Sequence, residues 1–342
     1  MEPLKALKHY QGLWQPAIEN KLRATVFNAI GDDYAPLRAM LAYHLGWEGE
    51  GAGAEAQGKR IRPLLALLSC AAAGGDWHRA LPAAAAVELL HNFSLIHDDI
   101  QDRSEVRRGR LTLWVKWGVP QAINAGDLMF TLAHLAALEL ESQTVPSIVI
   151  EASQLLHRTC VHLTQGQFLD LHNETSSQLA LEDYWRMVAG KTAALLGCCT
   201  ELGALVADVS NERRVAFYNF GFNLGLAFQV LDDWLGIWGD SDQTGKSTES
   251  DLVTGKKTLP VLYALAKNDR FAEVWRSGPV DPITVPLLAE MLMEEGAAEF
   301  TLAEADRLTN VAVNALEAAV RDGEDAADAL RGLTDQLLHR RK

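Results

Sequence analysis

The amino-acid sequence predicts an all-α protein with a large core. Its apolar spacing supports the fold class, and its apolar content supports the core. From Val119 to Asp208, apolar residues recur at helical spacing in segment after segment, and no stretch there alternates apolar and polar residues as a half-buried strand does. Apolar residues make up 48% of the 342 residues, which is enough for a large core. Length alone does not decide between one domain and two.

The first 45 residues are expected to form two or three helices. Pro16 and Pro36 are expected in first helical turns, where proline is well tolerated, and Gly31–Asp33 is expected to separate two helices. The apolar spacing of these helices suggests packing onto the body of the subunit or onto a second subunit. No residue type or spacing here points to chemistry.

The segment Gly58–Pro63, GKRIRP, places three cations within four residues, and its proline can begin the next helix. A helix N-terminus that carries Lys59 and Arg62 favours an anion, because the helix dipole, the free amides and the side chains all attract negative charge. On these residues alone, a solvated basic cap is the alternative.

Helices are predicted over most of the remaining chain, at Leu64–Ala73, Ala80–Asp102, Val119–Leu140, Ile148–His172, Leu181–Ala207 and Asn211–Trp238. The turn after Asp102 carries Arg107, Arg108 and Arg110, and guanidinium groups can bind phosphate oxygens through two parallel hydrogen bonds. After Pro260 we expect further helices to about residue 340 and no catalytic residues.

Three aspartates end the second of these helices. Asp98 and Asp102 stand one above the other at i,i+4, with Asp99 beside them and His91 two turns earlier on nearly the same face. Like charges at this spacing repel by about 0.2–0.5 kcal/mol on a solvated helix, so a cation between them is expected. Mg²⁺ fits best, because it prefers oxygen ligands and is commonly held by one or two carboxylates and phosphates.

A second aspartate pair lies far along the chain, in FQVLDDWLGIWGD at Phe228–Asp240. Asp232 and Asp233 interrupt an apolar helical run, with Gln229 one turn before them. Two apolar helices that each carry an aspartate pair could face each other across a cavity and hold metal ions against a diphosphate. For either motif alone, a solvated aspartate pair is the alternative.

These two motifs resemble the two aspartate-rich motifs of the trans-type isoprenyl diphosphate synthases, the polyprenyl synthetase family. LIHDDIQD is similar to the first motif and FQVLDDWLG to the second. Further matches run in the family's order over about residues 55–265, at Gly58–Pro63, Arg107–Gly109, Gly166–Leu171, Lys191–Thr192, Gly245–Leu252 and Gly255–Pro260. Six or more short motifs in order are far more specific than any one of them.

The resemblance implies a single all-helical domain over residues 1–342, a bundle of antiparallel helices around a central apolar cavity. It implies Mg²⁺-dependent head-to-tail condensation of isopentenyl diphosphate with an allylic diphosphate, with three Mg²⁺ ions per active site when substrate is bound. The catalytic residues it implies are Asp98, Asp99, Asp102, Lys191, Asp232 and Asp233, of which Asp98, Asp102 and Asp232 bind Mg²⁺.

The same resemblance implies the substrate-binding residues. Isopentenyl diphosphate is expected to bind Lys59, Arg62, His91 and Arg108. The allylic diphosphate is expected to bind Arg107, Lys191, Lys246 and Lys256, with Thr192 and Gln229 completing the set. A lysine inside an apolar run needs an anion or a route to the surface, and at Lys191 the resemblance favours a phosphate.

The second motif departs from the family pattern, DDxxD. Gly236 stands one turn after Asp232, where the family has an aspartate, so one carboxylate is missing. Asp240 lies two turns beyond Asp233, too far to expect direct ligation. We expect Asp232 to hold the ion on this side, with water in place of the lost carboxylate.

Product length is expected to depend on Phe93, five residues and about 7.5 Å down the helix axis from Asp98. An aromatic residue there, followed by Ser94, resembles the geranylgeranyl diphosphate synthases. We expect mainly a twenty-carbon product, with the fifteen-carbon product of a farnesyl diphosphate synthase as the alternative. The sequence also admits a class I terpene cyclase, whose usual second motif is not evident, and a regulatory subunit of a hetero-oligomeric synthase.

Composition limits the partners and the compartment. The formal net charge of −14 argues against nucleic-acid or anionic-membrane binding, because the protein's field would repel phosphate polymers. The four cysteines, at positions 70, 160, 198 and 199, suggest free thiols in a reducing compartment. No apolar stretch reaches the ~20 residues of a membrane span and no signal sequence is visible, so we expect a cytoplasmic protein without stable membrane insertion. The resemblance suggests a homodimer.

Overall fold

The computed structural model describes residues 2–176, 179–239, 250–278, 280–281, 283–321 and 325–338. Within them the regular secondary structure is helical except for one two-stranded antiparallel hairpin. Its strands, β1 (Val106–Arg107) and β2 (Arg110–Leu111), lie at the basic turn after Asp102. The all-α prediction is confirmed. The chain divides into two compact units, which are described in turn: Met1–Cys160 with Cys198–Tyr218 and Ala319–Gly332, and Val161–Gly197 with Asn219–Ala318 and Leu333–Lys342.

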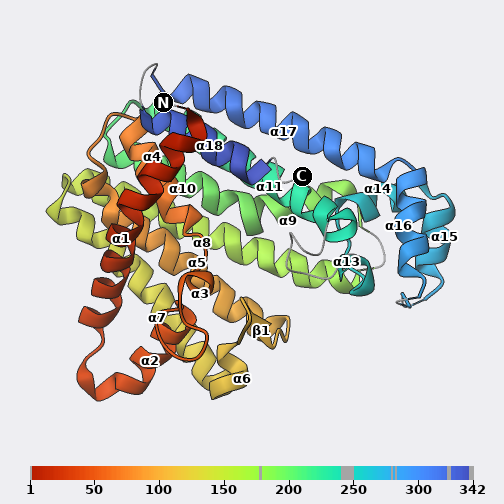
Figure 1. Cartoon of the computed structure of the whole chain (residues 1–342), viewed down its shortest axis with the longest axis horizontal. Coiled ribbons are helices and arrows are strands. Elements are labelled where there is room, and N and C mark those ends of the chain that lie inside the picture. The colour runs from red at the N-terminus through yellow and green to blue at the C-terminus, as the bar shows by residue number, and fades with distance from the viewer. Residues whose placement is uncertain are drawn as a thin grey trace. The chain divides into compact units, whose positions relative to one another are not determined.

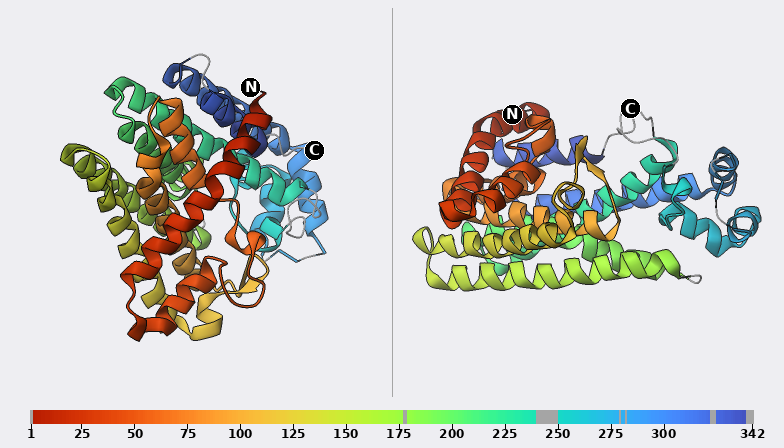
Figure 2. Two further views of the ribbon diagram at one scale, coloured as in Figure 1. Left: turned by 60° about the vertical axis from the view of Figure 1, so that its left-hand side comes forward. Right: turned by 90° about the horizontal axis from the view of Figure 1, so that it is seen from below.

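The first unit is built around helices α5 (Leu81–Gln101) and α7 (Val119–Leu138), which lie side by side (Figure 1). Small alanine side chains at positions 83–86 of α5 are buried and let neighbouring helices approach closely. The other elements that lie within this unit are α1 (Pro3–Ala29), α2 (Ala35–His44), α3 (Ala54–Gln57), α4 (Ile61–Ala72) and α6 (Leu113–Trp117). Helix α1 is seen along its whole length in the left-hand view of Figure 2 and packs on α5.

A buried ion-pair network fixes the start of α4. The Arg60 side chain is 1% exposed, and its guanidinium donates hydrogen bonds to Glu19 on α1 (2.5 Å), Glu88 on α5 (2.7 Å) and the Leu45 carbonyl (3.1 Å). A buried guanidinium is tolerated only when its donors are satisfied by such partners. The network therefore ties α1, α4 and α5 together through Arg60 of the GKRIRP segment itself.

The second unit holds α9 (Leu181–Val188), a π-helical turn (Ala189–Ala193), α13 (Ser250–Val253), α14 (Leu259–Lys267), α15 (Arg270–Arg276), α16 (Val285–Glu294) and α17 (Ala297–Ala319) to residue 318. Its core includes Ile237, Leu252, Val261, Phe271 and Leu292. Within the described chain, α17 gives its last residue, Ala319, to the first unit, and four further helices contribute residues to both units, namely α8 (Pro146–Thr175), α10 (Ala194–Val206), α11 (Asn211–Trp238) and α18 (Asp325–Leu338).

Three details of the sequence prediction are corrected. Pro16 lies inside α1 and not in a first turn, whereas Pro36 does start α2. Helix α4 begins at Ile61, so Pro63 sits inside its first turn. The helix predicted over Leu181–Ala207 is interrupted by the π-helical turn.

One apolar helical stretch also exceeds the expected length. Leu181–Val206 is long and apolar enough to cross a bilayer by length and composition, contrary to the expectation from the sequence. However, 72% of its most apolar 18-residue stretch is buried inside the protein, as in a core helix of a soluble protein.

Candidate active site

The aspartates of the first motif are divided between two faces of α5. Asp99 is 2% exposed and forms an ion pair with Arg107 of the hairpin, with Oδ1 at 2.8 Å from both Nε and Nη2. Burial raises the pKa of Asp99 to about 6, and the Arg107 guanidinium acts in the opposite direction. Asp98 is partly accessible and Asp102, at the C-cap of the helix, is exposed. Asp99 thus anchors the hairpin, while Asp98 and Asp102 offer oxygen ligands on the accessible side.

Cationic side chains gather beside these aspartates. The Arg108 guanidinium donates to the carbonyls of Ala56 and Gln57, both at 3.0 Å. A Cβ atom on Gly58, whose φ is +77°, would lie 2.8 Å from Cζ of Arg108, so only glycine allows this approach. Gly58 therefore allows Arg108, one of the predicted phosphate ligands, to lie against the GKRIRP segment. Lys59, the next residue, is exposed.

Two nitrogen atoms in this cluster, Nε of Arg62 and Nε2 of His44, are buried and have no hydrogen-bond partner among the described residues. His44 ends α2 and shares a small cavity with Asp99, Arg107 and Arg108. Burial and the positive charge of Arg108 lower the pKa of His44 to about 3. A buried donor without a partner and mutually repelling cations both favour an anionic ligand.

His91 belongs to the same cluster. Burial, followed by the charges of Arg62 and Arg108, lowers the pKa of His91 well below its usual value. The structure therefore brings together four predicted residues, Arg62, His91, Arg107 and Arg108, and adds His44. His44 was not predicted from the sequence, because it lies outside every motif and nothing in its neighbourhood marks it.

The second motif lies in the other unit, on a cavity of about 240 Å³. Asp233 is 5% exposed and accepts hydrogen bonds from the Tyr184 hydroxyl (2.7 Å), Gln229 Nε2 (2.9 Å) and the Leu259 amide (3.1 Å). Burial raises the pKa of Asp233 to about 7, while these hydrogen bonds oppose the shift. Asp233 thereby joins α9, α11 and α14, and Asp232 lines the cavity beside it.

Lys191 enters the same cavity from the π-helical turn. A Cβ atom on Gly166 of α8 would lie 2.1 Å from the Lys191 backbone nitrogen, so the two segments touch through their backbones. This close approach places the Lys191 ammonium in an ion pair with Asp170. The next residue, Thr192, donates to Gln229 Oε1 at 2.9 Å. π-Helical turns are rare and occur frequently at functional sites.

Two adjacent lysines follow the second motif in the described chain. Lys256 is exposed and lines the cavity, as expected. Lys257 was not expected to have a role of its own. It donates to the carbonyls of Asn173, Glu174 and Ser176 at 2.6–2.9 Å and so satisfies the C-terminal end of α8. Lys246 and Asp240 lie outside the described residues.

The donor set fits Mg²⁺. The accessible carboxylates Asp98, Asp102 and Asp232 supply hard oxygen ligands. Within the described part of the chain, no three His, Cys, Asp or Glu side chains could together hold a metal ion. Mg²⁺ is usually bound by one or two carboxylates while phosphate oxygens and waters fill the other positions.

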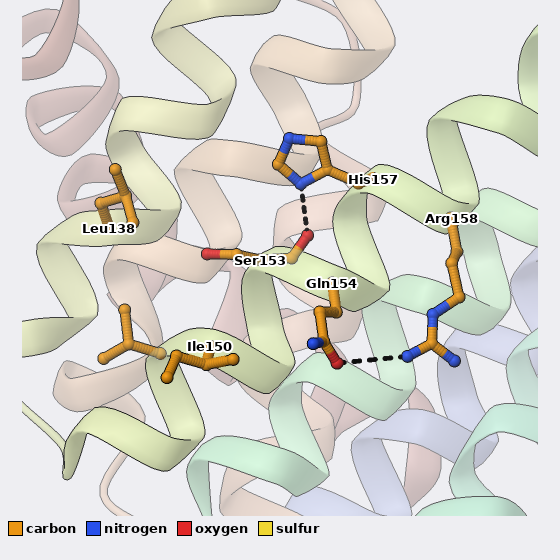
Figure 3. A pocket seen from close by; sticks show the side chains of 7 residues that line it. Leu138, Ile150, Ser153, Gln154, His157 and Arg158 are labelled. Atoms are coloured by element: carbon orange, nitrogen blue, oxygen red, sulfur yellow. Dashed lines mark hydrogen bonds between the residues drawn. The ribbon is translucent and has the colours of Figure 1, made fainter.

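Phe93 packs against a row of aromatic rings in the first unit. Its ring lies 5.1 Å from Phe130 of α7, Phe130 lies 4.5 Å from His134, and His134 stacks on His157 at 4.1 Å. Figure 3 shows His157 in a surface pocket with Leu138 and Ile150, where its ring donates to the Ser153 carbonyl. In the same pocket, Arg158 Nη2 donates to Gln154 Oε1 at 3.3 Å.

The polyprenyl synthetase family model matches residues 52–279. The chain is 46% identical over 233 residues to a geranylgeranyl diphosphate synthase of Mycobacterium tuberculosis and 44% identical over 232 residues to a (2E,6E)-farnesyl diphosphate synthase of Mycobacterium bovis. Each match covers 67% of this chain, and they span 65% and 64% of the relatives' own lengths, just under two thirds.

A solved structure agrees in fold over nearly the whole chain. The geranylgeranyl pyrophosphate synthetase from Pyrococcus horikoshii superimposes with a TM-score of 0.88 at 30% identity, covering 98% of both chains.

The unpartnered imidazole of His44 leads to a first prediction. His44→Ala should weaken binding of inorganic diphosphate about tenfold, because the cluster loses a buried imidazole whose Nε2 can donate to the anion in one of its two neutral tautomers. Isothermal titration calorimetry measures this affinity. The control is His78→Ala, since His78 is exposed and pairs with Asp76 in the same unit. Equal diphosphate affinity in the two variants would exclude His44 from the anion site.

Proposed function

The chain belongs to the polyprenyl synthetase family, and from this premise we propose that it adds isopentenyl diphosphate head to tail to an allylic diphosphate, as a Mg²⁺-dependent prenyltransferase. The observation that carries the proposal is the division of charge in the first unit. Accessible carboxylates at Asp98 and Asp102 lie in the same unit as a cluster of arginines in which, among the described residues, Nε of Arg62 is buried without a hydrogen-bond partner. Such a site suits a diphosphate that arrives with Mg²⁺.

The allylic diphosphate would bind to Asp98, Asp102 and Asp232 through Mg²⁺, which as a Lewis acid stabilises the leaving diphosphate. Lys191, Lys256 and Lys246 would bind diphosphate oxygens directly, and Arg107 would do so while Asp99 holds its guanidinium in place. Thr192 donates to Gln229, and Gln229 in turn donates to Asp233. As the carbon–oxygen bond breaks, these residues retain the diphosphate and the allylic cation remains.

Isopentenyl diphosphate would bind to Lys59, Arg62, His91 and Arg108, with His44 beside them. Its double bond attacks the allylic cation, and loss of a proton, with the departing diphosphate as the expected base, completes one addition. Apolar helix faces would keep water from the cation, as chain elongation requires.

We propose geranylgeranyl diphosphate as the main product. One relative carries this name and another is named a farnesyl diphosphate synthase, so the alternatives differ by one addition. Phe93 lies five residues before Asp98, and its ring packs against Phe130. These two rings would stop a growing chain, while Ser94 leaves the next position small.

We also propose a cytoplasmic homodimer. Exposed apolar side chains occur on α7 and on the first half of α8, at Ile123 (42% exposed), Leu135 (47%), Leu138 (48%) and Ile150 (59%), and Leu138 and Ile150 line one surface pocket. Contiguous exposed apolar residues mark interaction surfaces, and a second copy is the expected partner. None of the four cysteines, all of which lie in the described chain, forms a disulfide, as expected in a reducing compartment.

The proposed function predicts a defined product. With labelled isopentenyl diphosphate, an allylic primer and Mg²⁺, the isolated protein should form a linear twenty-carbon diphosphate, and EDTA should abolish the reaction. Chromatographic sizing identifies the product, and a reaction without primer is the control. A cyclic hydrocarbon would indicate a terpene cyclase, and inactivity that only a second chain restores would indicate a regulatory subunit.

The role of Phe93 gives a further prediction. Phe93→Ala should shift the product toward chains longer than twenty carbons, because the ring that blocks elongation is removed. The matched control is Phe300→Ala, since Phe300 stacks on Tyr263 in the other unit. If both variants keep the wild-type product distribution, Phe93 does not limit chain length.

The proposed dimer is tested by Ile150→Glu. A charge on the apolar face should convert the dimer to a folded monomer, measured by size-exclusion chromatography with light scattering. Ile283→Glu, at a side chain that is 85% exposed in the second unit, should remain dimeric. A wild-type mass of one chain would refute the dimer.

A further inference from the structure

The loop that connects α2 to α4 folds around Arg110, the first residue of β2. Arg110 is buried, at 9% exposed. Its guanidinium donates hydrogen bonds to the carbonyls of Tyr43 (Nη1, 2.5 Å), Glu48 (Nη2, 2.7 Å) and Glu50 (Nε, 2.8 Å). A buried guanidinium needs acceptors for its donors, and these three carbonyls come from one short segment. Arg110 therefore fixes the path of the chain from Tyr43 to Glu50.

The sequence of this loop allows the chain to approach Arg110 closely. Gly49 and Gly51 have φ angles of +84° and +69°, which favour glycine. A Cβ atom on Gly49 would lie 2.8 Å from Cδ2 of Tyr43, and one on Gly51 would lie 3.3 Å from Cγ of Arg110. The Tyr43 ring lies against the guanidinium, with Cζ 3.8 Å from the ring centroid, and its hydroxyl donates to the Leu111 carbonyl at 2.9 Å. The loop and the hairpin thus pack together with Arg110 between them.

The far end of the loop is held by Arg108 of the same hairpin. Its Nη1 donates to the carbonyls of Ala56 and Gln57, both at 3.0 Å, so a diphosphate can be bound through Nε and Nη2. Within the loop, the Gly53 amide donates to the Gly46 carbonyl at 3.1 Å and joins the two halves. The position of the carbonyls that hold Arg108 therefore depends on the first half of the loop.

The same loop joins residues that are expected to bind isopentenyl diphosphate. His44 lies where the loop begins, and Lys59 lies where it ends. Arg107, which is expected to bind the allylic diphosphate, is instead held by its ion pair with Asp99 on α5. A change in the loop should therefore affect one of the two diphosphate sites more than the other.

We propose that Arg110 is a positioning residue for isopentenyl diphosphate. By holding the first half of the loop, it sets where three other side chains meet this substrate, namely His44, Lys59 and Arg108. Arg110 itself does not bind phosphate, because its buried guanidinium donates to the loop. The inference rests on the proposed function, which assigns isopentenyl diphosphate to these side chains.

Two variants loosen the loop from opposite sides. Arg110→Lys keeps the positive charge, but a single ammonium nitrogen cannot replace donors that are spread over a planar guanidinium. Gly49→Ala keeps the arginine and places a methyl group against the Tyr43 ring, at a φ angle that strains alanine. If Arg110→Lys does not fold, Gly49→Ala still carries the test.

Each variant has a matched control in the first unit. Arg213→Lys removes another guanidinium that donates to backbone carbonyls, those of Ala319 (3.0 Å) and Ala73 (3.5 Å). Gly74→Ala introduces alanine at a φ angle of +91°, where a Cβ atom would have no neighbour within 4 Å. These controls report the cost of losing such hydrogen bonds, or of such strain, outside the loop.

Steady-state rates are measured while isopentenyl diphosphate and the allylic primer are varied in turn. Arg110→Lys and Gly49→Ala should each raise the KM for isopentenyl diphosphate about tenfold, the effect of weakening one hydrogen bond to an anion. The KM for the allylic primer should change by less than about twofold, a split that a general loss of folded protein would not produce. Both controls should keep the two wild-type KM values, even where their melting temperatures fall.

Hydrogen–deuterium exchange supplies a readout that does not need activity. Amide exchange over residues 46–58 should become faster in Arg110→Lys and Gly49→Ala and should stay unchanged in Arg213→Lys and Gly74→Ala. Exchange at wild-type rates in Arg110→Lys would overturn the inference, because the loop would then not depend on Arg110.

Two kinetic results would also overturn the inference. One is a wild-type KM for isopentenyl diphosphate in a folded loop variant, and the other is an equal rise in both KM values. The proposed function fails separately, if the wild type elongates no prenyl chain. In that case calorimetry with inorganic diphosphate still tests the positioning role, since Arg110→Lys should bind it about tenfold more weakly than Arg213→Lys does, and equal affinities would refute that role.

Discussion

The high cost of burying an ionised group without a partner organises both units of this protein. Structural charges are paired. Arg60 meets Glu19 and Glu88, while Asp99 meets Arg107. Asp233 likewise accepts three hydrogen bonds that join three helices. Buried polar atoms without a protein partner, such as Nε of Arg62 and Nε2 of His44 among the described residues, therefore indicate where a ligand or water binds.

The same constraint assigns different roles to adjacent aspartates. In each motif one carboxylate, Asp99 or Asp233, is buried and bonded to protein groups, while its neighbour, Asp98 or Asp232, remains accessible. Successive residues on a helix point about 100° apart, so an adjacent pair naturally divides into an inward and an outward member. Two adjacent aspartates therefore give each motif one carboxylate that bonds to protein groups and one that can bind a ligand. The two aspartates could exchange these roles only if the helix rotated.

Sequence patterns predicted the helices that carry these motifs, because apolar periodicity directly reports which face is buried. Asn211–Trp238 was predicted to the residue. The π-helical turn was not predictable, since it depends on backbone contact between Gly166 and Lys191. His44 was not predicted from the sequence for a similar reason. It carries no motif, and only the packing of α2 brings it to Arg108, 64 residues later in the chain.

Gly236 illustrates how reading a motif along the chain differs from reading it in space. A missing aspartate in DDxxD suggests a weakened metal site when only spacing is considered. In the fold, a Cβ atom on Gly236 would meet the carboxylate of Asp251 on α13, because Ile237 and Leu252, the residues that follow these two, belong to the same core. A side chain at position 236 would require the Asp251 carboxylate to move, so the residue that fits there depends on the neighbouring segment as well as on the motif spacing.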